Sequence, residues 1–439
     1  MRQEQLINLP IEWKRGNGLR KSDLDDEGKY KCILYGELYT KHKNALIENR
    51  ELSRTNKTGA FYSKKGDILV PGTSTASKKD MLLAREIDED GVILGGDINV
   101  IRPKQGLFAK KYLPYFFDTF SAYDQLDRYI TGATGIIHIS NTGLKKLKVP
   151  LPSYQEQQRI VSILDEAFAA IAKAKANAEQ NLKNAKELFE SYLQGVFEKK
   201  GDGWEEKPLK ELTTKIGSGA TPRGGQESYK SEGISLVRSM NVHDWEFRER
   251  NLAFIDDKQA KELDGVTLQE DDVLLNITGA SVARCCVFPK EYLPARVNQH
   301  VSIIRPKKEL LNARFLNLLL TSKPYKDQLL FTGEQGATRQ AITKAQIETF
   351  RISIPPLNEQ QTIVRQLDAL RAETQKLEAV YQKKIADLEE LKKSILQKAF
   401  AGELHGGEPA EPKTEKSRRD EKIIENKINH PRTNPEGVK

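Results

Sequence analysis

The chain has 439 residues, of which 38% are hydrophobic and 30% charged, with a formal net charge of +8. These values indicate a globular protein with room for two or three domains, and the positive charge permits a polyanionic partner. No apolar run reaches membrane-spanning length, no signal peptide opens the chain, and three cysteines favour neither a disulfide framework nor a metal knuckle, so we expect a cytoplasmic protein.

Residues 1–150 alternate short apolar runs with turns that contain glycine or proline. The clearest strand-like runs are Asp67–Val70, Gly91–Leu94 and Ile98–Ile101. Aromatic residues gather on one face of a predicted helical segment near Tyr112–Phe120. The pattern predicts a mixed α+β domain.

Residues 151–200 read as one long helix. Pro152 stands just before it, and neither proline nor glycine interrupts it until Gly195. The stretch from Leu164 to Phe197 would measure roughly 50 Å at about 1.5 Å per residue. Seven-residue spacing of apolar side chains predicts a coiled-coil face. The positions expected to contact a second helix are Leu164, Ile171, Ala178, Ala185, Leu188 and Tyr192.

Residues 201–354 form a second mixed domain that resembles the first. The segment His300–Lys307 repeats Asp97–Lys104 at an offset of 203 positions. Three further pairs of segments are matched between the domains: Gly16-Asn17-Gly18 with Gly217-Ser218-Gly219, Gly66–Leu69 with Asp271–Leu274, and Gly132-Ala133-Thr134 with Gly336-Ala337-Thr338. A repeat of this size indicates a duplicated domain rather than a solenoid.

Residues 355–402 predict a second long helix. Glu359 lies 203 positions after Glu156, and Phe400 lies 203 positions after Phe197, so the two helices are copies of fixed length. The first face is rich in alanine and the second is bulky, which favours a pair containing one copy of each; alternatively, each helix packs on its own domain. The contact positions expected in the second copy are Leu367, Leu370, Leu377, Tyr381, Leu388, Leu391 and Ile395. Residues 403–439 are predicted to be a disordered tail.

Motifs that carry chemistry are absent from the sequence. It has no phosphate-binding loop, no complete dinucleotide fingerprint and no histidine cluster with metal-ligand spacing. Asp271 and Asp272 could form a metal pair, but their place before Val273 favours a turn that leads into a strand. Cys285 and Cys286 are interpreted as core residues rather than reactive thiols. We therefore predict neither a catalytic nor a metal site in this chain.

Several loops combine glycine with side chains that recognise nucleic acid. Arginine and lysine contact guanine or phosphate, asparagine and glutamine bind adenine, and glycine-rich backbone approaches phosphate. Any one such loop can equally be an ordinary solvated turn. The candidate DNA-binding residues are Arg54, Asn56, Lys57, Lys78, Lys79, Ser218, Thr221, Arg223, Asn276, Thr278, Arg284, Asn298, Gln299, His300, Arg339 and Gln340.

The duplicated helices carry the pattern by which the sequence resembles a known family. Each has a proline followed by Glu-Gln-Gln, at Pro152 with 156–158 and at Pro355 with 359–361. Each ends in Leu-Gln-x-x-Phe, at Leu193–Phe197 and Leu396–Phe400. The architecture is similar to that of the specificity subunit of type I restriction-modification systems. In the second domain, the segments Gly217–Pro222 and Gly336–Ile342 also resemble motifs of the family. The first domain departs from them, because Gly16-Asn17-Gly18 lacks a following Thr-Pro and Gly132-Ala133-Thr134 lacks a following Arg-Gln.

The resemblance implies a non-catalytic, sequence-specific DNA-binding subunit. Its fold would be two mixed α/β target-recognition domains separated by two long helices that form an antiparallel coiled coil. Each domain would read one half of a bipartite site in double-stranded DNA. Two modification subunits, which bind S-adenosylmethionine, would dock on the helices, and motor-nuclease restriction subunits could join them. A coiled-coil scaffold with protein-binding end domains and a self-sufficient endonuclease are the alternative interpretations.

Overall fold

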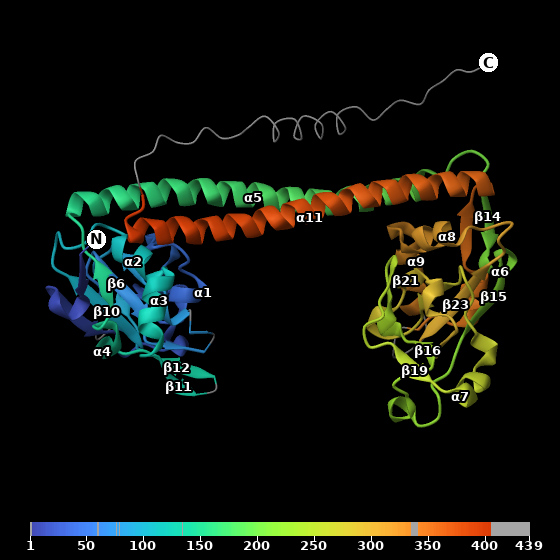
Figure 1. Cartoon of the computed structure of the whole chain (residues 1–439), viewed down its shortest axis with the longest axis horizontal. Coiled ribbons are helices and arrows are strands. Elements are labelled where there is room, and N and C mark those ends of the chain that lie inside the picture. The colour runs from blue at the N-terminus through green and yellow to red at the C-terminus, as the bar shows by residue number, and fades with distance from the viewer. Residues whose placement is uncertain are drawn as a thin grey trace, which may run out of the picture. The chain divides into compact units, whose positions relative to one another are not determined.

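The structure, a computed structural model, describes residues 2–58, 61–75, 77–78, 80–133, 135–334 and 341–404. Its contacts divide the chain into two compact units (Figure 1). Unit 1 comprises Met1–Ala174 with Asp387–Lys439, and unit 2 comprises Lys175–Ala386. Each long helix is therefore shared between the units, whereas the sequence-based division kept each helix as a separate segment. The predicted tail lies outside the described residues from position 405.

Unit 1 contains a mixed α+β domain with a five-stranded sheet in the order β2-β10-β6-β8-β4. Three smaller sheets have the orders β5-β3-β9, β11-β12-β7 and β1-β13. Its strands are β1 Gln3–Gln5, β2 Ile11–Arg15, β3 Tyr30–Ile33, β4 Leu46–Ile47, β5 Ser53–Thr55, β6 Asp67–Pro71, β7 Thr73–Ser74, β8 Arg85–Ile87, β9 Ile93–Leu94, β10 Ile98–Pro103, β11 Thr131–Ala133, β12 Ile136–His138 and β13 Lys148–Pro150. The helices are α1 Glu37–Thr40, α2 Tyr112–Phe117, α3 Phe120–Asp127, α4 Asn141–Leu144, the first part of α5 Tyr154–Lys199 and the last part of α11 Leu357–Ala401.

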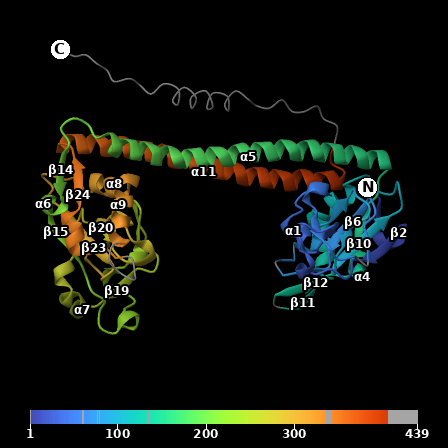
Figure 2. The same ribbon diagram turned by 180° about the vertical axis from the view of Figure 1, so that it is seen from behind.

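Unit 2 contains the second mixed domain, whose main sheet has the order β15-β23-β20-β21. The smaller sheets are β19-β16-β22, β17-β18 and β14-β24, and Figure 2 shows β14 beside β24, the strand that leads into α11. Its strands are β14 Glu205–Pro208, β15 Thr213–Ser218, β16 Ile234–Val237, β17 Val242–His243, β18 Glu246–Phe247, β19 Ala253–Ile255, β20 Val273–Asn276, β21 Cys285–Val287, β22 Ala295–Val297, β23 Val301–Pro306 and β24 Arg351–Ile354. The helices are the last part of α5, α6 Leu209–Leu212, α7 Asp257–Glu262, α8 Ala313–Thr321, α9 Lys323–Glu334, α10 Lys344–Thr349 and the first part of α11 Leu357–Ala401.

The two domains share one strand framework, as their sequence similarity predicts. In unit 1, β10 pairs with β2 and β6, and in unit 2, β23 pairs in the same way with β15 and β20. Arg15 lies opposite Asn99, and Ser218 lies opposite Ser302, each residue 203 positions after its counterpart. This register corrects the predicted glycine match, because Gly16 corresponds to Gly219 and not to Gly217. The spacing of the glycines in the sequence does not reveal the strand register, and the register decides which glycines of the two domains correspond.

A buried ion pair occupies the same place in both frameworks. The guanidinium of Arg102 donates two hydrogen bonds to the Asp67 carboxylate, at 2.7 and 2.8 Å. Arg305 binds Asp272 at the same two distances. Both aspartates are fully buried at the start of a central strand, and the bond to Asp67 raises the pKa of Arg102. The interpretation of Asp272 as part of a turn that leads into a strand is thus confirmed, and its carboxylate stabilises the fold.

The first Gln of each Glu-Gln-Gln motif is attached to its own domain. The buried Gln360 amide accepts a hydrogen bond from the Asn312 backbone N–H at 2.9 Å and donates to the Leu310 and Pro355 carbonyls at 3.0 and 2.9 Å. Gln157 makes the equivalent bonds to the segment before α2 and to Pro152. These buried amides satisfy backbone groups of the domain and of the segment that leads into the helix, and they fix the start of each long helix.

Replacing Gln360 by alanine is expected to lower the free energy of unfolding of unit 2 by about 3 kcal/mol, since it removes three hydrogen bonds made by a fully buried side chain. Urea unfolding of the full-length chain, followed by tryptophan fluorescence, measures the change. Gln361→Ala is the matched control, because Gln361 is the exposed neighbour in the same motif. Equal effects of the two substitutions would contradict this role for Gln360.

The Leu-Gln-x-x-Phe ends of the helices insert aromatic rings into the cores. In unit 1, Phe400 from the end of α11 lies 5.2 Å from the ring of Tyr112 and 5.3 Å from that of Phe116. In unit 2, Phe197 from the end of α5 lies 5.5 Å from the ring of Phe315, the residue that corresponds to Tyr112. In each unit α2 or α8 lies between the sheet and the long helices (Figure 1). The start of one long helix thus joins the end of the other within each unit, so the predicted antiparallel pairing is confirmed.

The predicted heptad face is only partly correct. Among the predicted contact positions, Leu164, Ile171, Ala178, Ala185 and Leu367 are buried, and Leu370, Leu377, Tyr381, Leu388 and Ile395 are half-buried. Leu188, Tyr192 and Leu391 are exposed by 45, 46 and 47%, so these three assignments are wrong.

The drift of a straight helix explains the three errors. After Ala185 the buried positions of α5 are Phe189, Leu193 and Phe197, four residues apart. In α11, Ile363, Thr374 and Leu396 are buried at multiples of eleven residues. A helix with 3.6 residues per turn rotates by about 20° per heptad relative to a 3.5-residue repeat, and an eleven-residue repeat follows it more closely.

No helix among the described residues is both long and apolar enough to cross a membrane.

Candidate nucleic-acid interface

Four of the candidate residues form one chain of hydrogen bonds in the second domain. The Thr221 hydroxyl, in the loop after β15, donates to the side-chain oxygen of Gln299. The Gln299 side-chain nitrogen lies 3.1 Å from Nε2 of His300, and Nδ1 of His300 lies 2.6 Å from Oγ1 of Thr278. Thr221 and Gln299 are exposed, whereas Thr278 and His300 are half-buried. Three loops separated by up to 79 positions therefore present one connected polar surface.

Glycine and backbone contacts hold these loops together. The Gly219 N–H donates to the Asn298 carbonyl at 3.1 Å, and a β-carbon at Gly219 would lie 1.7 Å from the Val297 oxygen. Gly16 donates to the Ile98 carbonyl at 2.9 Å, and a β-carbon there would lie 2.0 Å from the Gly95 oxygen. Only glycine fits either position. In each domain, this glycine lets the loop after β2 or β15 pack against the turn before β10 or β23.

Two asparagines of the predicted site have structural roles instead. Asn276 is fully buried, and its side-chain amide donates to the Ser239 carbonyl at 2.9 Å and the Ser281 hydroxyl at 3.2 Å. Asn298 is buried, and its side-chain oxygen accepts the His300 N–H at 3.1 Å. Neither amide can reach a DNA base, so these two assignments are wrong. Asn276 instead holds the loop after β20, and Asn298 positions the backbone of His300.

The remaining described candidates of the second domain lie in the same loops or directly beside them. Ser218 at the end of β15 and Arg223 in the following loop are exposed, and Arg284 is half-buried at the end of the loop that follows β20. Arg339 and Gln340 lie outside the described residues. The residues that follow them are placed: Ala341 is bridged to Thr278, and the Ile342 N–H donates to the Ile277 carbonyl at 2.8 Å.

The candidates of the first domain are engaged within the protein. Arg54 donates to the Gly28 carbonyl at 2.9 Å, Asn56 to the Asp25 carboxylate at 2.6 Å, and Lys57 to the Asp23 carboxylate at 3.1 Å. Lys78 donates to Asp127 at 2.8 Å, which raises the pKa of the lysine. Lys79 lies outside the described residues. The four described side chains join surface loops to one another, and two acidic partners neutralise the lysine charges.

Sequence reasoning missed four residues at the corresponding surface of the first domain. Thr73, which corresponds to Thr278, has its hydroxyl 3.0 Å from Nδ1 of His138 on β12. Asp97, at the place of His300, pairs with Arg15, at the place of Ser218. In the strand register, His138 occupies the position of Ala341. Aligning the two domains by this register would have identified His138 as a candidate. The two surfaces therefore share backbone geometry and differ in their side chains.

The two adjacent cysteines of the second domain are buried and free. Burial raises the pKa of the Cys285 thiol to about 12 and also raises that of Cys286, which agrees with their interpretation as core residues. Within the described ranges, no group of three or more His, Cys, Asp or Glu side chains could hold a metal ion.

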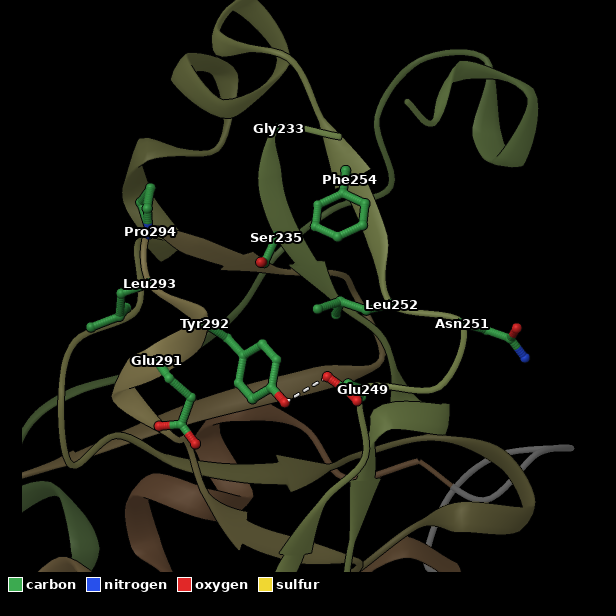
Figure 3. A pocket seen from close by; sticks show the side chains of 10 residues that line it. All are labelled: Gly233, Ser235, Glu249, Asn251, Leu252, Phe254, Glu291, Tyr292, Leu293 and Pro294. Atoms are coloured by element: carbon green, nitrogen blue, oxygen red, sulfur yellow. Dashed lines mark hydrogen bonds between the residues drawn. The ribbon is translucent and has the colours of Figure 1, made fainter. Parts of the chain in front are cut away.

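A pocket of about 420 Å³ lies in the second domain (Figure 3). Its lining includes the carboxylates of Glu249 and Glu291, and the Tyr292 hydroxyl donates to Glu249 at 2.8 Å. Leu252 and Phe254 supply apolar surface. Two carboxylates repel phosphate, so this pocket is not a candidate contact for the DNA backbone.

Comparison with known proteins identifies the family. Residues 1–183 and 201–387 match the sequence model described as "Type I restriction modification DNA specificity domain". A putative type I restriction enzyme MjaX specificity subunit of Methanocaldococcus jannaschii is 24% identical over 355 residues, covering 77% of this chain and 78% of that protein. The type I restriction enzyme EcoBI specificity subunit of Escherichia coli is 22% identical, covering 82% of this chain and 80% of that protein.

A solved structure shows the same fold. The HsdS subunit of Thermoanaerobacter tengcongensis has a TM-score of 0.58 and 19% identity, with 92% of this chain and 97% of that chain covered. At that identity the likeness concerns the fold alone.

Proposed function

Because the chain belongs to the family of type I restriction-modification DNA specificity proteins, we propose that it reads a bipartite DNA site, one half with each domain. The supporting observation is one framework used twice with different side chains at the reading surface. Both domains keep the buried Arg–Asp pair and the obligatory glycine. At corresponding positions the first domain has Gly96 and Asp97, and the second has Gln299 and His300. Two domains that share a strand framework but differ in their surface side chains are suited to a target whose two halves differ in sequence.

The proposal includes the partners that carry the chemistry. The chain itself is non-catalytic, and two modification subunits bind along α5 and α11 and methylate adenine with S-adenosylmethionine in their own sites. Leu188 and Tyr192 support this, since they are exposed four residues apart on one face of α5 and offer apolar surface to a partner. Restriction subunits with motor and nuclease activity complete a cytoplasmic restriction enzyme.

A methylome comparison tests the function directly. Host DNA is sequenced for modified adenines with and without the chain, in the presence of its modification subunits. The expected result is one bipartite motif that is methylated only when the chain is present. A gel shift in which duplex DNA does not bind at any salt concentration would favour the protein scaffold, and metal-dependent cleavage by the purified chain would favour the endonuclease.

Exchange of one domain is expected to change one half of the motif. Residues 203–355 are replaced by the corresponding domain of a divergent family member, which leaves both long helices and the first domain intact. The expected methylome retains the spacer and one half-site and acquires a new second half-site. A motif in which both halves change together would contradict independent reading, and re-inserting the original domain is the control.

A further inference from the structure

The hydrogen bonds around Gln299 restrict what this side chain can offer to DNA. A free glutamine amide has two N–H donors and two oxygen lone pairs, and it rotates to suit its partner. Here Thr221 donates to the amide oxygen, and the amide nitrogen lies within hydrogen-bond distance of His300 Nε2. One donor and one acceptor remain, on an exposed amide whose rotation is restrained from both sides.

The histidine that restrains the amide is itself held. Its Nδ1 lies 2.6 Å from the Thr278 hydroxyl, and its backbone N–H donates to the buried Asn298 side chain. When Nε2 accepts from Gln299, Nδ1 carries the proton and donates to Thr278, so neutral His300 has a single tautomer here. The direction of the Gln299 amide is therefore fixed through His300, which acts as a positioning residue.

From this arrangement, and resting on the proposed function, we propose that Gln299 reads an adenine in the half-site of the second domain. Adenine presents the N7 acceptor beside the N6 amino donor in the major groove, and a glutamine amide binds the two together. Guanine presents two acceptors at this edge, which one donor and one acceptor cannot both satisfy. An amide fixed before binding also loses less rotational freedom when the complex forms.

The first domain lacks this reader. The residue that corresponds to Gln299 is Gly96, which has no side chain, and its neighbour Asp97 is paired with Arg15 instead of a histidine. The proposal therefore assigns an adenine contact to one half-site only. Gly96 also supplies a matched control, because an added β-carbon there would have no atom within 4 Å.

The test begins with the full-length chain and a random pool of duplexes, from which the retained sequences give the consensus. Adenines of the second half-site, defined by the domain exchange above, are then replaced one at a time by 7-deazaadenine, which lacks only N7. At one position the wild-type chain is expected to lose about tenfold in affinity, whereas Gln299→Ala loses no further affinity there. Gln299→Glu, an acceptor only, is expected to lose the adenine preference, and Gly96→Ala to retain it.

The substitution His300→Ala tests whether His300 orients the Gln299 amide or only supports the loop. It is expected to reduce the adenine preference at the same position by a larger factor than it reduces affinity for random duplexes, because the rotation of the Gln299 amide is then no longer restrained. If Gln299→Ala keeps the full 7-deazaadenine effect at every adenine, the inference is wrong although the bipartite reading stands. If the wild-type chain retains no preferred sequence, the proposed function itself fails and the inference fails with it.

Discussion

The substitution Asp272→Asn is expected to lower the free energy of unfolding of the second domain by about 3–5 kcal/mol. The carboxylate is fully buried and binds Arg305 through two hydrogen bonds, while its Oδ2 also accepts the Gln269 N–H at 2.7 Å. Removing the negative charge leaves a largely buried guanidinium without its counter-ion, and breaking such a pair from one side is far costlier than the pair's net contribution. Urea unfolding of the full-length chain measures the loss.

Asp271→Asn is the matched control for this prediction. The Asp271 side chain is half exposed and pairs with the exposed Lys308, so the change is expected to stay within about 0.5 kcal/mol. Its backbone has φ of 70°, a conformation that asparagine tolerates. Asp67→Asn should reproduce the large effect in the first domain, where Arg102 occupies the place of Arg305. A loss under 1 kcal/mol for both buried aspartates would contradict the role of the pair.

Patterns with a strong local cause could be predicted from the sequence. The strand runs at Asp67–Val70 and Ile98–Ile101 became β6 and β10, because a short continuous apolar run between turn residues is visible in a few positions and both runs are buried throughout. The long helices follow from the absence of helix breakers over more than forty positions. Their antiparallel pairing was implied by family resemblance, and the aromatic contacts of Phe197 and Phe400 supply its physical reason.

Errors arose where tertiary geometry decides the outcome. The exposure of Tyr192 depends on helix rotation accumulated over several turns, which a seven-residue count ignores. Asn276 reads as a polar loop residue, yet it is fully buried because β20 extends through it and the following loop folds back over its amide.

Only part of the candidate site could be predicted, because the proximity of its residues also depends on tertiary geometry. Thr221, Thr278, Gln299 and His300 were chosen by residue type, but nothing local showed that three loops bring them together. Lys57 was chosen in the same way, and it pairs with Asp23, whose position in the fold a single sequence does not reveal. Side-chain type is therefore a guide to recognition chemistry, whereas the availability of that side chain depends on long-range partners.

Shortening both long helices is expected to have the largest effect on target recognition. Deleting residues 170–180 from α5 and 382–392 from α11 removes three turns from each helix and about 16 Å of length, at about 1.5 Å per residue. Eleven residues close to whole turns, so the buried face continues in phase across each junction. If the helices set the spacer, two domains can no longer engage both halves of the original site together. The advantage of tethered binding, about 10²- to 10⁴-fold, is then lost for that site.

Affinity for the original target and for targets with altered spacers measures this effect, and the methylome reports it in cells. The full-length control carries Lys173→Ala and Asn177→Ala, two exposed positions inside the deleted window, and should retain the original target. The shortened chain is expected either to select a new spacer or to lose bipartite binding, because tethering helps only when the linker length suits the distance between sites. Full affinity of the shortened chain for the original spacer would show that helix length does not set the distance between half-sites, and the spacer would then have to be determined by the partner subunits.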